Sequence, residues 1–321
     1  MRRVLRYAFR AVLGILVILG SGLVWAHLSI RQERAPLPTL DQIRASAPAE
    51  GDVPVGLSII NTASQPMARS GVLDAHRDPH PDEPYVMSHP SFVLQWADGR
   101  RLLIDVGMTP EQAIAFGKPI ELLGGKPTEP HGAVADQLGD AKQQVQGVVF
   151  THTHTDHVGG IGALCAALMR PLPAFMTEAQ SQRPNYTTRP GLKDLAEASC
   201  VQPMALGSAP LKSVPGFPGV QVIDAGGHTP GSQIILATVQ APDGAHRYAF
   251  TGDIVNNLDG ITADVPKPFV YRTFLVPEDE TRQEELRVFL KHLHDDLGYT
   301  LLVSHDQRAL EASGVQPFQK S

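Results

Sequence analysis

The sequence predicts a layered α/β fold, and three observations support that prediction. Short apolar runs of strand length recur between residues 55 and 304. Stretches with helical character separate groups of these runs, which favours packed α/β layers over an all-β fold. The chain has 321 residues, 42% of them hydrophobic and 19% charged. That balance can build a substantial core, and it excludes a wholly disordered chain and a polytopic membrane protein.

Charge and residue counts narrow the function. A formal net charge of −6 and a pI near 6.1 argue against a broad nucleic-acid-binding face, so no nucleic-acid partner is expected. The two cysteines, Cys165 and Cys200, are too few for a disulfide framework or a cysteine-rich zinc site. Thirteen histidines, against six tyrosines and two tryptophans, are the first sign of chemistry.

Residues 1–34 are predicted to be an N-terminal signal anchor or signal peptide with a basic flank. Residues 1–10 contain four arginines and no acid, and the apolar run 11–28 approaches the length that crosses a bilayer. The basic flank should stay in the cytoplasm, which places the catalytic body in the periplasm or extracellular space. An uncleaved anchor, and hence a membrane partner, is the preferred interpretation. A secreted protein, cleaved near Ala26, and an ordinary buried helix are the alternatives.

Residues 35–54 are predicted to be a linker. If the chain is exported, its body lies in an oxidising compartment, where Cys165 and Cys200 can form a disulfide. Two free, buried thiols remain the alternative, because the sequence gives no distance between them.

The body begins with strands. Asp98-Gly99 is a two-residue turn signal that joins the second and third of them as a hairpin, and Pro242-Asp243-Gly244 turns a later pair. Two helices are predicted. Residues 162–169 stop before Pro171, and residues 278–297 carry apolar side chains at helical spacing. The predicted strands are residues 55–60, 91–96, 101–106, 146–151, 220–223, 233–239, 247–251 and 300–304.

The stretch 69–90 differs from the rest of the body. It contains three histidines, several acids and four prolines, and it has no periodicity. A solvated loop is the preferred interpretation, and a loop that borders a functional site is the alternative.

Residues 151–157, Thr-His-Thr-His-Thr-Asp-His, follow an apolar strand and predict a metal site. Imidazole nitrogens and carboxylate oxygens are ligands for zinc and similar ions. Alternate residues of an extended segment point the same way, so His152 and His154 can converge on one ion. Asp156 and His157 lie where the chain turns, and they can face a second ion.

Two ions need more ligands, and three later residues occur in suitable settings. His228, Asp253 and His305 each follow a predicted strand and lie beside glycine or a turn. A rigid sheet can present a side chain to a cleft from such a position.

Together these motifs resemble the metallo-β-lactamase superfamily of hydrolases. The HxHxDH cluster is that family's hallmark, and the Gly-His-Thr-Pro-Gly, Thr-Gly-Asp and Ser-His segments match its later motifs in order. Asp105, in Ile-Asp-Val-Gly, resembles the family's early aspartate, which supports the site. The resemblance implies an αββα sandwich in which residues 55–321 form one domain, with the site along a sheet edge.

The resemblance also implies the ligand set. His152, His154 and His228 would hold one ion, Asp156, His157 and His305 the other, and Asp253 would bridge them. Zn²⁺ is the expected metal, although manganese or iron would also suit these ligands. Family members with oxygen-reducing iron chemistry typically have Glu in place of His154, so a hydrolase is favoured over a di-iron redox protein.

Two divalent ions can share a water and lower its pKa, which makes a hydroxide nucleophile. Asp156 is the candidate catalytic residue, because it could orient that hydroxide or pass its proton to the leaving group. Tyr186 and Tyr271 are candidate acids, with packing roles as the alternative, and Thr153, Thr155 and Thr229 could orient ligands through their hydroxyls.

The substrate is expected to be a small molecule, and the sequence makes no prediction of oligomeric state. Residues 255–274 contain aromatic and proline side chains that could line an acyl pocket or form a packed crossover. A lactone or other ester is therefore favoured. A phosphodiesterase and a β-lactamase are the alternatives on the same scaffold.

Overall fold

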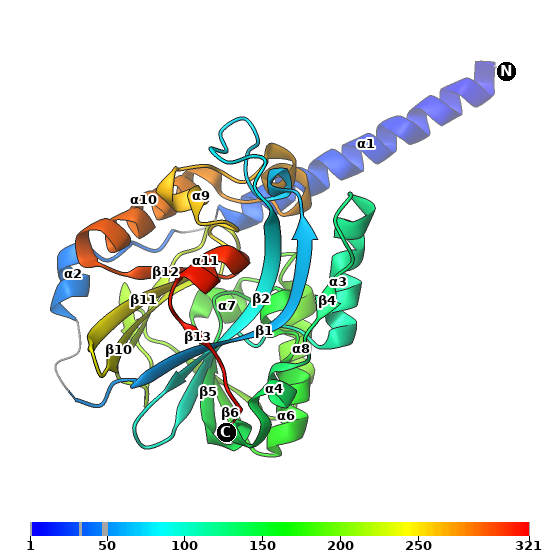
Figure 1. The fold of residues 1–321 in the computed structure, drawn as a ribbon. Helices are drawn as coiled ribbons and strands as arrows, with labels where there is room; N and C mark the ends of the chain where they lie inside the picture. Colours follow the sequence, from blue (N-terminus) through cyan, green and yellow to red (C-terminus); the bar gives the residue numbers. More distant parts are fainter. Residues whose placement is uncertain (1, 32–33, 47–50, 321) are drawn as a thin grey trace.

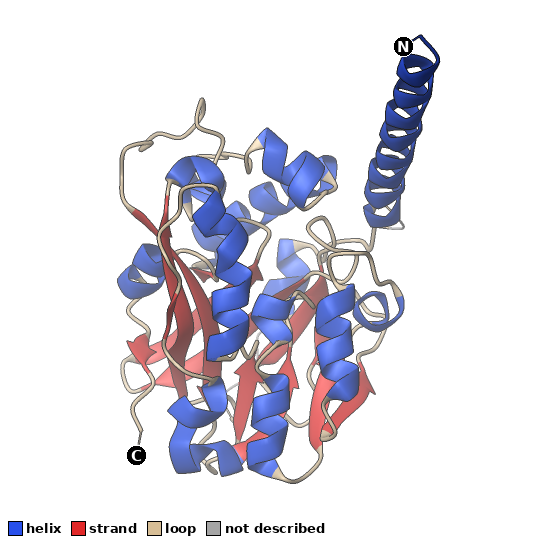
Figure 2. Ribbon diagram, turned by 90° about the vertical axis from the view of Figure 1, so that its right-hand side faces the viewer, coloured by secondary structure: helices blue, strands red, loops and turns tan. Residues whose placement is uncertain are grey.

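The computed structural model describes residues 2–31, 34–46 and 51–320. Two β-sheets pack face to face, and helices cover their outer sides (Figures 1 and 2). This is the αββα sandwich that the motifs implied.

The first sheet has the order β13-β1-β2-β3-β5-β6-β7, and β4 pairs with β1 outside that path. β1, β2 and β3 run antiparallel, whereas β3, β5, β6 and β7 run parallel. Its strands are β1 (Gly56–Met67), β2 (Tyr85–Gln95), β3 (Arg101–Ile104), β4 (Glu129–Pro130), β5 (Val145–Val149), β6 (Leu172–Met176), β7 (Val201–Ala205) and β13 (Gln316–Pro317).

The second sheet has the order β12-β11-β10-β9-β8. Its pairs are antiparallel except β11 with β12, so β9, β11 and β12 all end at the same edge. Its strands are β8 (Leu211–Ser213), β9 (Val220–Asp224), β10 (Gln233–Ala241), β11 (Gly244–Gly252) and β12 (Thr300–Val303).

Helices α4 and α6 pack on the outer face of the first sheet, and α10 packs on that of the second. The helices of the body are α2 (Leu40–Ala45), α3 (Pro110–Leu122), α4 (Val134–Leu138), α5 (Thr155–Val158), α6 (Ile161–Leu168), α7 (Glu178–Gln182), α8 (Arg189–Glu197), α9 (Asp259–Thr262), α10 (Glu280–Leu297) and α11 (Gln307–Ala312). Short 3-10 turns span η1 (Arg69–Gly71) and η2 (Gly139–Gln144), and the π-turn η3 spans Tyr271–Leu275.

The core has three layers because each inner strand buries both faces. In β2, Phe92 and Leu94 point between the sheets, whereas Val93 points toward the helices over the first sheet. This two-residue alternation puts apolar side chains on both faces of the strand. A third cluster lies between the second sheet and α10.

Each of the eight predicted strands overlaps an observed one, and the predicted helices correspond to α6 and α10. The prediction of a loop over 69–90 was wrong at its end, because β2 begins at Tyr85. The buried polar side chains of Ser88 and His89 interrupt the apolar pattern from which a strand is predicted.

The predicted linker 35–54 contains α2, whose Ile43 is buried against the α10 side of the second sheet. This part of the segment is therefore packed onto the body, and residues 47–50 lie outside the described residues. Helix α1 (Arg2–Ile30) projects from the body (Figures 1 and 2). Within the described chain it is the one helix that is long and apolar enough to cross a membrane.

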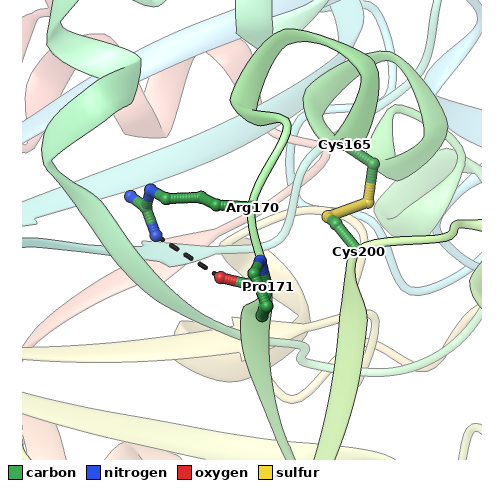
Figure 3. The surroundings of a disulfide bond; sticks show 4 residues. All are labelled: Cys165, Arg170, Pro171 and Cys200. Carbon is green, nitrogen blue, oxygen red and sulfur yellow. Dashed lines mark hydrogen bonds between the residues drawn. A yellow bond between two sulfur atoms is a disulfide. The ribbon is translucent and has the colours of Figure 1, made fainter.

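Cys165 and Cys200 form a disulfide between α6 and the segment that precedes β7 (Figure 3). Of the two alternatives left open by the sequence, the structure has the bonded pair.

Candidate metal centre

Four strand ends converge on one edge of the sandwich. Residues 151–157 follow β5 of the first sheet, whereas His228, Asp253 and His305 follow β9, β11 and β12 of the second. The backbone N–H of Gln233 donates to the carbonyl of Thr151 and joins the two sheets there. The site therefore takes its side chains from both sheets.

Gly252 allows two of those strand ends to approach each other closely. Its φ of 52° lies in the left-handed region, and a Cβ added to it would lie 2.8 Å from the Cβ of Thr151. Because only glycine lacks that atom, the Thr-Gly-Asp segment can bring Asp253 beside the histidine cluster.

The first group of side chains consists of His152, His154, His228 and Asp253. His154 Nδ1 lies 3.0 Å from His152 Nε2 and 3.2 Å from His228 Nε2. Asp253 Oδ2 lies 3.9 Å from His152 Nε2 and 3.6 Å from His228 Nε2. Ligands of a tetrahedral zinc ion with bonds of about 2.0–2.1 Å lie about 3.3 Å apart, so this spacing fits one ion.

The second group consists of Asp156, His157, His305 and again Asp253. His157 Nε2 lies 3.1 Å from Asp253 Oδ1 and 3.6 Å from Asp156 Oδ2. His305 Nε2 lies 3.0 Å from Asp253 Oδ2 and 3.4 Å from Asp156 Oδ2. The two oxygens of Asp253 thus face both groups.

The structure brings all seven predicted residues together, and six are buried, His154 being partly exposed. His157 Nε2 and Asp253 Oδ1 are buried and, although they lie 3.1 Å apart, neither makes a hydrogen bond of good geometry. Such unpaired buried polar atoms are costly unless something else binds them. The two His/Asp groups fit two metal ions, which would use these free lone pairs.

In His157 and His305, the ring nitrogen that points away from the centre donates to an acceptor, and this hydrogen bond fixes the tautomer. His157 Nδ1 donates to Asp105 Oδ2 at 2.8 Å, and His305 Nδ1 donates to the carbonyl of Ser88 at 2.7 Å. With the proton held on the far nitrogen, Nε2 of each ring keeps its lone pair toward the centre.

His154 is oriented through its other nitrogen. Thr187 donates its hydroxyl proton to Asn185 at 2.8 Å, so its oxygen can accept from His154 Nε2, also at 2.8 Å. The free lone pair of His154 is therefore on Nδ1, the atom that faces His152 and His228.

Asp105 holds the histidine cluster in place through hydrogen bonds. Its Oδ1 accepts from the backbone N–H of Thr151 at 2.8 Å, and its Oδ2 accepts from the Thr151 hydroxyl at 2.7 Å as well as from His157. Its carboxylate has no free oxygen for a metal, which agrees with the supporting role implied for it.

A buried Glu278–Lys267 pair holds His228. His228 Nδ1 donates to Glu278 Oε1 at 2.6 Å, and Lys267 Nζ donates to the same oxygen at 2.7 Å and to the carbonyl of Asp253. Burial alone would raise the pKa of Glu278, but Lys267 and His228 outweigh it and lower that pKa. The sequence reasoning missed both residues, although Glu278 opens the acidic start of the predicted helix.

Burial and charge divide the imidazoles into two classes. Burial lowers the pKa of His152 and His228, and it lowers that of His154 to about 3, so all three are neutral and able to bind metal. Burial would also lower the pKa of His157, but the carboxylates of Asp253, Asp156 and Asp105 raise it well above its usual value. The space between these three carboxylates therefore favours a positive charge, which is a proton on His157 or a bound metal ion.

Other predicted supporting residues have different roles. The Thr229 hydroxyl contacts Ser232 at 2.9 Å, and no hydrogen bond among the described residues joins Thr153 or Thr155 hydroxyls to a candidate ligand. Thr151 and Thr187 contact the imidazoles instead.

His89, from the stretch predicted to be a loop, is buried with Nδ1 3.5 Å from Asp156 Oδ2.

The family model described as the metallo-beta-lactamase superfamily matches residues 84–305, more than half of the chain. The chain belongs to the metallo-beta-lactamase superfamily. Family and site together identify a metal-dependent hydrolase. Among curated proteins, no match was found for this superfamily member.

Solved structures share the metallo-beta-lactamase fold at low identity. An N-acyl homoserine lactone hydrolase with bound N-hexanoyl-L-homoserine is 15% identical, with a TM-score of 0.58 over 81% of this chain and 96% of that one. A quorum-quenching N-acyl homoserine lactone lactonase is 17% identical, with a TM-score of 0.59 over 84% and 99%. A dizinc quorum-quenching lactonase is 14% identical, with a TM-score of 0.51 over 79% and 90%.

Proposed function

We propose that this protein hydrolyses a lactone or a related ester with an apolar acyl chain. The seven side chains identified above would hold the two ions, with Zn²⁺ as the proposed metal. One observation carries the substrate proposal: the candidate metal centre opens onto a cleft with an apolar wall. The products bound in two similar lactonases are consistent with this choice.

The cleft has a volume of about 410 Å³ and reaches His154, Asp156, Asp253 and His305. Helix α3 forms one wall, and the π-turn η3 with the residue that follows it forms the other. The apolar residues that line the cleft are Met87, Ala115, Phe116, Pro119, Ile120 and Val276. These walls suit an acyl chain whose ester carbonyl reaches the two ions.

The charge of the cleft distinguishes between substrate classes. None of the described residues that line it is Lys or Arg. A phosphodiester carries a negative charge that such residues usually bind, whereas a lactone is neutral. The lining therefore supports an ester over a phosphodiester.

Two bound divalent ions would lower the pKa of a shared water and polarise the ester carbonyl. Asp156 lies on the cleft side of the centre and is the proposed proton acceptor. Its carboxylate, whose pKa is lowered by His157, His89 and His305 although burial alone would raise it, stays ionised and can take a proton from the attacking water.

Tyr271 is the proposed donor to the substrate. It lines the cleft, and burial, with Glu278 and Asp253, raises its pKa well above the usual value, so its hydroxyl stays protonated. Tyr186 instead donates to the carbonyl of Leu275 at 3.3 Å and is not among the cleft residues.

We further propose that α1 is an uncleaved membrane anchor and that the catalytic body lies outside the cytoplasm. Ala26 and Ile30 of α1 are buried, and His27 Nε2 donates to the carbonyl of Thr273 at 3.1 Å. A cleaved signal has no need for such contacts with the mature body. The Cys165–Cys200 disulfide also favours an oxidising compartment.

The test is a substrate panel assayed on the purified, zinc-loaded full chain. N-acyl lactones should be turned over, whereas a phosphodiester and a β-lactam should not. His152→Ala should lower kcat/KM for the lactones by at least about 100-fold, because one ion loses a ligand. His246→Ala, an exposed histidine on β11, is the matched control and should retain the rate. Turnover of the phosphodiester alone would overturn the proposal.

A further inference from the structure

The two lips of the cleft carry exposed apolar side chains that the proposed chemistry does not use. The π-turn η3, which presents Tyr271 to the cleft, and the residues before it expose four of them, and the end of α3 exposes two. Their exposed fractions range from 51% to 88%. This apolar rim consists of Leu122, Leu123, Phe269, Val270, Phe274 and Leu275.

Large side chains of this kind, grouped around the mouth of a cleft, mark an interaction surface. Within the part of the chain that the structure describes, α1 lies against one lip, through His27 and Thr273. The position of α1 indicates what the apolar rim binds.

Helix α1 places the rim at the level of a bilayer. Its apolar run extends from Ala11 to Leu28, but contact with the body already begins at Leu23, after a stretch in which residues 3–22 are all exposed. Leu23, Ala26, His27 and Ile30 recur at helical spacing and form the face toward the body. The last part of the apolar run therefore lies beside the body, without a spacer between them.

A spanning helix buries its whole apolar run in the hydrocarbon region or its interface. Because the run overlaps the body, the lip beside α1 must reach the same interface. Phenylalanine and leucine side chains are favourable at that depth, whereas they are unfavourable in water.

We propose that the apolar rim docks on the lipid surface, so that the cleft opens toward the membrane and takes its substrate from the bilayer. The substrate class is then a lactone or ester whose acyl chain partitions into lipid. This substrate assignment rests on the proposed function, whereas the docking of the rim does not.

The docking test uses the full chain in vesicles of phosphatidylcholine and phosphatidylglycerol. Both native cysteines are in the disulfide, so an introduced cysteine is the one free thiol. A fluorophore on Phe274→Cys should be quenched by nitroxide-labelled lipids. The control is Val55→Cys, also exposed, next to the amino-terminal end of β1 on the side away from α1 (Figure 1).

Stronger quenching at Phe274→Cys than at Val55→Cys supports docking, and equal quenching overturns it. If the label on Phe274→Cys is shielded from lipid and the unlabelled variant forms a disulfide-linked dimer, a second copy covers the rim and the proposal fails. This readout needs no turnover, so it remains decisive even if the proposed hydrolysis is wrong.

The kinetic test compares two lactones, one with a short, water-soluble chain and one with a long chain dissolved in the vesicles. The double variant Phe269→Ser/Phe274→Ser should lower the rate on the long-chain lactone about tenfold, because burial of two large apolar side chains is lost. It should retain the rate on the short-chain lactone, as should Val55→Ser on both. An equal effect on both lactones would overturn delivery from the bilayer.

Discussion

Four of the seven candidate ligands, all histidines, are held by a second residue that decides which ring nitrogen faces the centre. Asp105, Ser88 and Thr187 accept from His157, His305 and His154, and Glu278 accepts from His228. These acceptors come from separate segments of the chain. The centre therefore depends on residues beyond its ligands.

Glu278→Gln should weaken metal binding without removing a ligand. The substitution replaces the carboxylate that orients His228 and leaves Lys267 without its buried counter-charge. We expect metal affinity to fall about 10- to 100-fold, as for other residues that orient a metal-binding histidine. Competition with a chromophoric chelator measures the change.

Glu284→Gln, an exposed position on α10, is the control for the loss of one carboxylate. If both variants bind metal as tightly as the wild type, Glu278 has no positioning role. A circular dichroism spectrum of Glu278→Gln shows whether the fold is retained.

The sequence predicted the seven residues at the centre because each follows an apolar strand or lies in a dense histidine motif. It did not predict Glu278, Lys267, Thr187 or His89. These are single residues whose neighbours carry no pattern, and they reach the centre only through tertiary packing. Asp306, the neighbour of His305, caps α11 and accepts from the backbone N–H of Leu258.

At the scale of elements, the predicted strands were those with uniform apolar runs. β6 and β7, which were not predicted, contain Pro173 and Pro203, and β7 is largely exposed at the end of its sheet. Proline and exposure both weaken the alternation from which a strand is predicted. Helix α3 was missed as well, although Thr109 caps it, because Gly117 and Pro119 interrupt its pattern.

The disulfide joins α6, which was predicted, to the segment that precedes β7, which was not. It closes a sequence separation of 35 residues, and the backbone N–H of Leu172 donates to the carbonyl of Cys200 beside it. Cys165→Ser/Cys200→Ser should lower the free energy of unfolding by about 3–4 kcal/mol, because the unfolded chain gains conformational freedom. Urea denaturation measures the difference.

The wild-type protein, denatured with and without a reducing agent, provides the control for the two serine side chains. Reduction should move the wild-type midpoint to that of the double variant. Identical midpoints in oxidised and reduced wild type would show that the bond contributes nothing to stability.

At the scale of the whole molecule, the candidate centre links the two sheets. His152, His154, Asp156 and His157 come from the first sheet, and the other three side chains come from the second. The sequence could not show this arrangement, because strand order is set by contacts between distant segments. The family resemblance supplied it.

Because the ligands come from both sheets, metal removal should destabilise the entire sandwich. A ligand that binds only the folded protein adds about 2.7 kcal/mol for each site at roughly 100 times its Kd. Two sites should therefore raise Tm by roughly 10 °C for a chain of this size. Scanning calorimetry of the full chain, stripped with EDTA and then titrated with Zn²⁺, measures the shift.

His305→Ala, which removes a ligand supplied by the second sheet, should show a much smaller shift, whereas His246→Ala should behave as the wild type. A Tm that is the same with and without metal would mean that the seven side chains do not bind ions across the sheets, and the hydrolytic proposal would lose its basis.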